Sequence, residues 1–156
     1  MNFDTRYLYI ILGLIVIMNL FSGSFDILGV LLTLPGVLVA ITFHEYAHAL
    51  AAYKLGDDTP KVQGRLNLNP LTHLDPIAVV LLVFTHIGWG KPVEINPNNF
   101  DRKISARAGE AIVAAAGPIM NILLAFVIAI IFYALQVFAT GFAIGTQTGM
   151  IIMTML

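Results

Sequence analysis

The sequence contains no cysteine and few charged side chains. Asp, Glu, Lys and Arg make up only 11% of its 156 residues, whereas soluble domains carry about 25%. Without cysteine the chain cannot form disulfides, thiolate metal sites or a cysteine nucleophile, so any metal ion must be held by His, Asp or Glu. A net charge of −1 gives no basis for a nucleic-acid partner. The low charge, the 58% hydrophobic content and a mean hydropathy of +0.87 predict a membrane protein.

The apolar residues are concentrated in several runs. Residues 25–55 and 111–140 are long enough to cross a bilayer core, which takes roughly 20 apolar residues. Residues 7–21 are marginal in length, and we interpret them as a retained anchor because they lack a small-x-small cleavage site before Ser22-Gly23-Ser24. Residues 77–87 are too short to cross and predict a re-entrant or interfacial segment. Residues 62–69 and 92–96 predict short strands in the loops around that segment.

The predicted fold class is therefore an all-α polytopic membrane protein. It has about three transmembrane helices, a re-entrant or hairpin segment and the start of a further helix, because the apolar residues 150–156 are too few to span. We expect residues 1–156 to form one membrane-embedded domain that is incomplete at its C-terminal end.

Positive charges predict the orientation of the chain. All eight Lys and Arg residues lie in the N-terminal tail and in the loops at 54–65 and 91–107, and the positive-inside rule places such loops in the cytoplasm. The predicted location is the plasma membrane, with the active site toward the cytoplasmic side. At 1.5 Å per residue, His44 and His48 would lie roughly 9–15 Å inside the cytoplasmic end of their helix. Asn121, on the next long apolar run, would lie at a similar depth.

His44, Glu45 and His48 form an H-E-x-x-H pattern inside an apolar run. Two histidines four residues apart lie on one face of a helix and can hold one Zn²⁺. The neighbouring glutamate can take a proton from a water that the ion activates. The alternative is a polar cluster that joins helices. We favour zinc, because ionisable residues inside a membrane are rare, costly and usually functional.

A catalytic zinc ion takes a third protein ligand. Within this chain the candidates are Asp75, His73, His86 and Glu94. Asp75 precedes Pro76 at the start of an apolar segment, where an ordinary helix cap is the favoured interpretation. His73 and His86 flank the same segment and are better explained as interfacial residues.

Asn121 has two interpretations that the residues alone leave open. It can donate a hydrogen bond between helices, or it can hold a substrate carbonyl and steady an oxyanion.

Four stretches resemble the site-2 protease family of intramembrane zinc metalloproteases, in particular its short prokaryotic members. They are HEYAHA at 44–49, GRLNLNPLTHLDP at 64–76, GWGKPV at 88–93 and AAGPIMN at 115–121. The resemblance implies that His44 and His48 are zinc ligands, that Glu45 is the general base and that Asn121 contacts substrate. It also implies a membrane-associated hairpin over residues 62–96, against which an unwound substrate segment lies extended.

The chain departs from this family at one point. The family's third zinc ligand is the Asp of a Leu-Asp-Gly motif on a later helix, and no such motif follows Asn121. Asp75 belongs to a different motif, so we do not transfer the ligand role to it. We therefore expect these 156 residues to hold an incomplete zinc site and to bind zinc weakly or be inactive.

The predicted function is an intramembrane zinc metalloendopeptidase. Its predicted partners are a membrane-spanning protein substrate and the lipid bilayer. Two alternatives come from other classes. A metal or proton transporter could use the same His and Glu side chains as relay groups, although we find none of the internal repeats that transporters often have. A catalytically inactive scaffold that binds membrane helices is the other.

Overall fold

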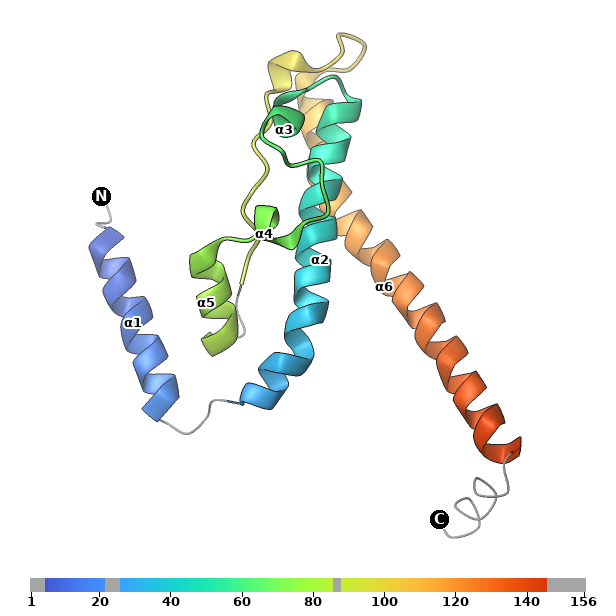
Figure 1. Ribbon diagram of the computed structural model, residues 1–156. Helices are drawn as coiled ribbons and strands as arrows, with labels where there is room; N and C mark the ends of the chain where they lie inside the picture. The colour runs from blue at the N-terminus through green and yellow to red at the C-terminus, as the bar shows by residue number, and fades with distance from the viewer. Residues whose placement is uncertain (1–4, 22–25, 86–87, 146–156) are drawn as a thin grey trace. The chain divides into compact units, whose positions relative to one another are not determined.

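The computed structural model describes residues 5–21, 26–85 and 88–145. The elements are α1 (Thr5–Phe21), α2 (Ile27–Lys54), α3 (Thr59–Val62), α4 (Pro70–His73), α5 (Pro76–Thr85), the 3₁₀ turn η1 (Pro97–Asn99) and α6 (Ala106–Gly145) (Figure 1). They form two compact units, residues 1–120 and 121–156, and α6 runs through the boundary. The predicted further helix at 150–156 falls outside the described residues.

Two of these helices are long and apolar enough to cross a membrane. They are α2, with 28 residues, and the part of α6 up to Thr140, with 35. The helical fold class is confirmed over the described residues, and both helices support the predicted membrane protein. The 17 residues of α1 fall short of the roughly 20 that a span takes, and α5 has 10. A third span and a re-entrant α5 therefore stay predictions.

The ends of α2 are set by an aspartate and a glycine. The Asp26 carboxylate accepts a hydrogen bond from the Gly29 N–H at 2.9 Å and caps the first turn. The helix then runs through Pro35 to Lys54. Gly56 follows with a φ of +103°, a conformation that favours glycine and ends the helix. The chain can therefore turn back along α2 immediately after the helix.

The polar stretch after α2 forms helical turns rather than the predicted strand. The strand prediction for residues 62–69 is wrong, because α3 ends at Val62 and asparagine side chains organise the residues after it. The Asn67 Oδ1 accepts hydrogen bonds from the Asn69 N–H at 2.7 Å and the Thr72 hydroxyl at 3.0 Å. Such local side-chain bonds compete with strand pairing. Both α3 and α4 pack against α2 (Figure 1).

The strand prediction for residues 92–96 is also wrong, because within the described ranges these residues form no regular secondary structure. The single bridge found in those ranges is antiparallel and joins Leu74 to Gly90. A small core holds this region to α2: Ala52, Phe100 and Val113 are buried together, and Leu55 and Ile95 pack against them. The core joins the end of α2 to the first turns of α6.

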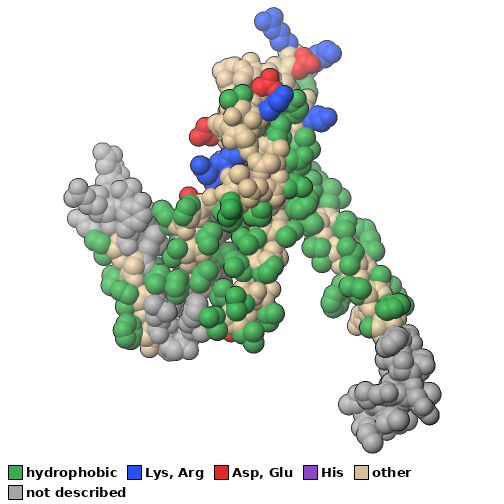
Figure 2. Space-filling view, viewed as in Figure 1, with side chains coloured by type: hydrophobic (Ala, Val, Ile, Leu, Met, Phe, Trp, Pro, Cys, Tyr) green, Lys and Arg blue, Asp and Glu red, His purple; other side chains and the backbone are tan. Residues whose placement is uncertain are grey.

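The charged side chains lie mostly together. Figure 2 shows Lys and Arg side chains gathered around α3 and the loop that leads into α6, while apolar side chains cover the helices. This arrangement agrees with the two basic loops predicted from the sequence. Which side of a membrane they face stays a prediction.

Candidate metal centre

His44 and His48 lie on one face of α2, one turn apart. Their ring centroids are 4.7 Å apart and the rings are nearly perpendicular, at 81°. This follows from the four-residue spacing, because side chains at i and i+4 lie over each other on a helix. The sequence prediction that the two imidazoles come together is therefore met within α2.

The backbone of α6 contacts both rings. The Nδ1 atom of His48 lies 2.6 Å from the Val113 carbonyl oxygen, and the backbone at Gly117 lies close to the His44 ring. Because a carbonyl can only accept, His48 donates through Nδ1–H, and its Nε2 then carries the lone pair that a metal ion needs. Residues four apart on α6 thus face residues four apart on α2.

Gly117 allows this close approach because it has no side chain. A Cβ placed there would lie 2.7 Å from the His44 Nε2 and closer still to the His48 Nε2. Real Cβ atoms essentially never come within 3.0 Å of such neighbours. Both Nε2 atoms therefore approach one point beside α6.

Glu45 is buried beside the two histidines, with 8% of its surface exposed. It lines a cavity of about 200 Å³ together with His48, Pro92, Val93, Ile95 and Val113. Its carboxylate and one imidazole therefore border the same space, as a base and a metal ligand acting on one water would require.

None of the described candidates for a third ligand joins this pair. The Asp75 Oδ1 accepts hydrogen bonds from the Ile77 and Ala78 N–H groups at 2.8 and 3.1 Å. Asp75 therefore caps α5, as the favoured interpretation predicted. The Glu94 carboxylate accepts a hydrogen bond from the Gln63 side chain at 2.7 Å.

His73 is fully buried in the protein, and its position at a membrane interface stays a prediction. Its Nε2 lies 2.8 Å from the Asn67 carbonyl oxygen, to which it donates. His86 lies outside the described residues. Over the part of the chain that the structure describes, no group of three His, Asp or Glu side chains could hold a metal ion. The donor set fits zinc through two imidazoles, and the third ligand is not among these residues.

Asn121 begins the second of the two units, directly after Met120. It lies four residues past Gly117 in α6. Its assignment as a substrate-contacting residue stays a prediction.

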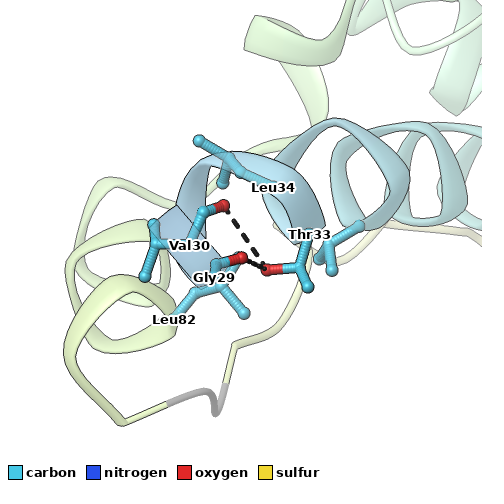
Figure 3. A pocket seen from close by; sticks show the side chains of 6 residues that line it. Gly29, Val30, Thr33, Leu34 and Leu82 are labelled. Atoms are coloured by element: carbon cyan, nitrogen blue, oxygen red, sulfur yellow. Dashed lines mark hydrogen bonds between the residues drawn. The ribbon is translucent and has the colours of Figure 1, made fainter. Parts of the chain in front are cut away.

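A second cavity lies along the first half of α2. It has a volume of about 230 Å³ and is lined by Gly29, Val30, Thr33, Leu34, Val37 and Leu82. Figure 3 shows the Thr33 hydroxyl bonded to the carbonyl oxygens of its own helix, to Gly29 at 2.8 Å and to Val30 at 3.4 Å. Its polar group is thus satisfied locally, and the site's histidines and glutamate take no part in this cavity.

Three residues contact the site although no sequence pattern assigned them a role there. Val113 acts through its carbonyl oxygen, which no side-chain pattern can reveal. Gly117 and Gly90 lie against the histidines and Glu45 respectively. Both stand next to signals in the sequence, a Gly-Pro pair and a Gly-Trp-Gly triplet, but only tertiary packing shows which side chains they touch.

Two curated proteins are similar to the chain. A Bacillus subtilis protein provisionally named zinc metalloprotease YwhC is 45% identical over 91 residues, which are 58% of this chain and 40% of that protein. A Mycolicibacterium smegmatis protein provisionally named zinc metalloprotease Rip2 is 32% identical over 101 residues, 61% of this chain and 37% of that protein. The chain is a relative of proteins named as zinc metalloproteases. The similarity to zinc metalloproteases that its motifs predicted is thereby confirmed.

The matched stretch spans about two fifths of the length of these relatives. No family model matches the chain, and no solved structure does. The relatives' names support a zinc metalloprotease, and the type of protease and the site at which it cuts are proposals.

Proposed function

We propose that the protein is an intramembrane zinc endopeptidase of the site-2 protease type, which cuts peptide bonds of membrane-spanning proteins. The observation that carries the proposal is the convergence of His44, Glu45 and His48. Two imidazoles approach one point, and the glutamate between them borders the adjoining cavity. This matches the donor set and the base of a zinc hydrolase.

His44 and His48 would hold Zn²⁺, which when bound supplies a Lewis acid that acidifies water and polarises a carbonyl. The hydrogen bond from His48 to the Val113 carbonyl fixes its tautomer and ring orientation. The proposal requires a third ligand, a carboxylate, from a part of the protein beyond the described residues.

Glu45 is the general base. Its burial beside His48 keeps the carboxylate at the edge of the cavity, where it can accept a proton from the attacking water. The same carboxyl then passes this proton to the departing amine, so that one side chain serves both halves of the reaction. Asn121 is proposed to donate a hydrogen bond to the carbonyl oxygen of the substrate.

The substrate would lie along residues 92–95, of which Pro92, Val93 and Ile95 line the cavity. Within the described ranges, the N–H groups of Val93, Glu94 and Ile95 make no backbone hydrogen bond. An extended peptide could pair with them as an added strand. A substrate helix must therefore unwind locally before it is cut. The site is proposed to open toward the cytoplasm, on the side of the basic loops.

The test is Glu45→Gln in the full-length protein. Wild-type and variant proteins are purified, their zinc is measured by plasma mass spectrometry, and cleavage of a membrane-spanning reporter is followed in vesicles. Glutamine keeps the shape of the side chain but cannot accept a proton, so we expect cleavage to fall by at least about 100-fold with zinc unchanged.

The control is Glu110→Gln, which makes the same substitution at an exposed glutamate of α6 that is not among the residues lining the cavity beside Glu45. It should cleave at the wild-type rate. Undiminished cleavage by Glu45→Gln would overturn the base assignment. A zinc-loaded wild-type protein that cleaves no membrane reporter would overturn the endopeptidase and favour a transporter.

A further inference from the structure

The backbone at Gly90 lies directly on the Glu45 side chain. A Cβ placed at Gly90 would be 2.6 Å from the Glu45 Oε1, 2.9 Å from its Cγ and 3.0 Å from its Cδ. All three of the nearest atoms belong to Glu45. The loop after α5 therefore forms one wall of the space in which this carboxylate sits.

The conformation of Gly90 does not itself require glycine. Among the described residues, positive φ angles occur at Gly56 and Gly64 but not at Gly90. Its backbone is therefore one that alanine can adopt. The reason for glycine at this position is the contact with Glu45.

Gly90 is also held in place by backbone contacts with His73 and Leu74. The antiparallel bridge joins Gly90 to Leu74, and the Lys91 N–H donates to the His73 carbonyl oxygen at 2.7 Å. The His73 imidazole is fully buried and donates to the Asn67 carbonyl. A continuous set of contacts thus runs from the asparagine turn through His73 and Gly90 to Glu45.

We propose that Gly90, anchored by His73, is a positioning residue that holds the Glu45 carboxylate in its productive orientation. A glutamate has three rotatable bonds, and confining it ahead of the reaction lowers the entropic cost of reaching the transition state. The inference rests on the proposed function for the role of Glu45, but the contact itself can be tested independently.

The contact is tested by crosslinking. The 156 residues contain no cysteine, and any cysteine elsewhere in the full-length protein is first replaced by serine. In Glu45→Cys the sulfur takes the place of the Glu45 Cγ, which lies 2.9 Å from a Cβ built at Gly90. Two cysteines this close can form a disulfide, in which the two Cβ atoms lie about 3.8 Å apart. We expect Glu45→Cys with Gly90→Cys to form a disulfide when oxidised with diamide.

The matched control pairs Glu45→Cys with Gly88→Cys. Gly88 belongs to the same loop, but a Cβ there would meet Leu82 and the Ala78 carbonyl instead of Glu45. Efficient crosslinking at position 90 and little at position 88 supports the contact. Equal crosslinking, or none at position 90, overturns it.

The positioning role is tested by Gly90→Ala. The added methyl group must displace the carboxylate, so we expect kcat to fall by about 100-fold while KM and zinc content stay unchanged. Gly36→Ala is the control, since a Cβ at Gly36 meets nothing within 4 Å. An unchanged kcat for Gly90→Ala overturns the proposal.

The anchor is tested by two substitutions at His73. His73→Leu removes the hydrogen bond to Asn67, whereas His73→Gln keeps an amide donor near the Nε2 position. The described residues give the His73 Nδ1 no partner, so glutamine loses no second bond. We expect kcat to fall in His73→Leu and recover in His73→Gln. Equal kcat values in these two variants and the wild type overturn the anchoring role.

These experiments separate the two proposals. If the wild-type protein cleaves no membrane reporter, the proposed function fails while the crosslinking result still decides the contact. If the wild type cleaves and Gly90→Ala cleaves equally well, the function stands and the positioning role fails.

Discussion

His48 donates a hydrogen bond to the carbonyl oxygen of Val113, 65 residues later in the chain, over 2.6 Å. The bond joins the histidine pair of α2 to the first turns of α6. Because the acceptor is a backbone atom, no side-chain substitution at position 113 removes it directly. The neighbouring Gly117, whose backbone contacts both imidazoles, offers the better test of this packing.

Gly117→Ala should weaken zinc binding in the full-length protein. The new methyl group would overlap the Nε2 atoms of both histidines, so at least one ring must turn away from the shared point. Substitutions of residues that contact metal ligands typically lower metal affinity 10- to 100-fold, and we expect a loss of about that size in the zinc affinity of Gly117→Ala. Zinc content after dialysis against a graded chelator series measures it.

Gly36→Ala is the matched control, because it adds the same methyl group to α2 in open space. It should keep its zinc at every chelator concentration that the wild type withstands. Wild-type zinc affinity in Gly117→Ala would mean that the two rings do not meet beside this glycine.

Asp75 offers a test of the third ligand. Its carboxylate caps α5 through the N–H groups of Ile77 and Ala78, so Asp75→Ser should keep the cap and leave zinc content unchanged. Asp75→Ala should lose about 1 kcal/mol of stability, seen as a lower melting temperature in detergent, again with zinc unchanged. Loss of zinc in both variants would instead make Asp75 a ligand.

The sequence predicts the long helices and the histidine pair on α2, but not the turns and tertiary contacts around them. The spacing of His44 and His48 places both rings on one face of a helix whatever surrounds it, and the apolar runs predict α2 and α6. The strand prediction for residues 62–69 is wrong because the hydrogen bonds that the Asn67 Oδ1 accepts depend on local geometry, which hydrophobic alternation does not report. The contacts of Gly90 and Gly117 are tertiary, and no periodicity encodes them.

Asp57 should contribute strongly to the stability of the loops that lead to the site. Its fully buried carboxylate accepts hydrogen bonds from the Thr59 hydroxyl at 2.6 Å, the Asn96 N–H at 2.7 Å and the Asn99 amide at 2.9 Å. Asp57→Asn removes the charge and leaves some of these donors unsatisfied, so we expect a loss of about 2 kcal/mol. Thermal unfolding in detergent measures the change.

Asp58→Asn is the control for this substitution. Asp58 is the next residue, it is exposed, and its side chain makes no capping hydrogen bond to α3. Its melting temperature should match the wild type within error. Equal losses in the two variants would show that the effect comes from the charge of this loop and not from the buried bonds.

Asp57 also predicts how the stability of the protein changes with pH. Burial raises the pKa of this carboxyl, but the hydrogen bonds from Thr59, Asn96 and Asn99 outweigh burial and hold the pKa below its ordinary value of 3.8. A folded-state pKa below the unfolded one stabilises the fold at pH values above 3.8. That contribution is lost as the pH falls through the folded-state pKa.

The prediction therefore concerns the difference in melting temperature between the wild type and Asp57→Asn at each pH. The gap in melting temperature between the wild type and Asp57→Asn should be constant from pH 7 to about 5 and narrow below pH 3.8. The other carboxyl groups titrate in both proteins, so their effects largely cancel. A gap that stays constant down to pH 3, about a unit below the ordinary pKa of an aspartate, would mean that the Asp57 charge does not support the fold.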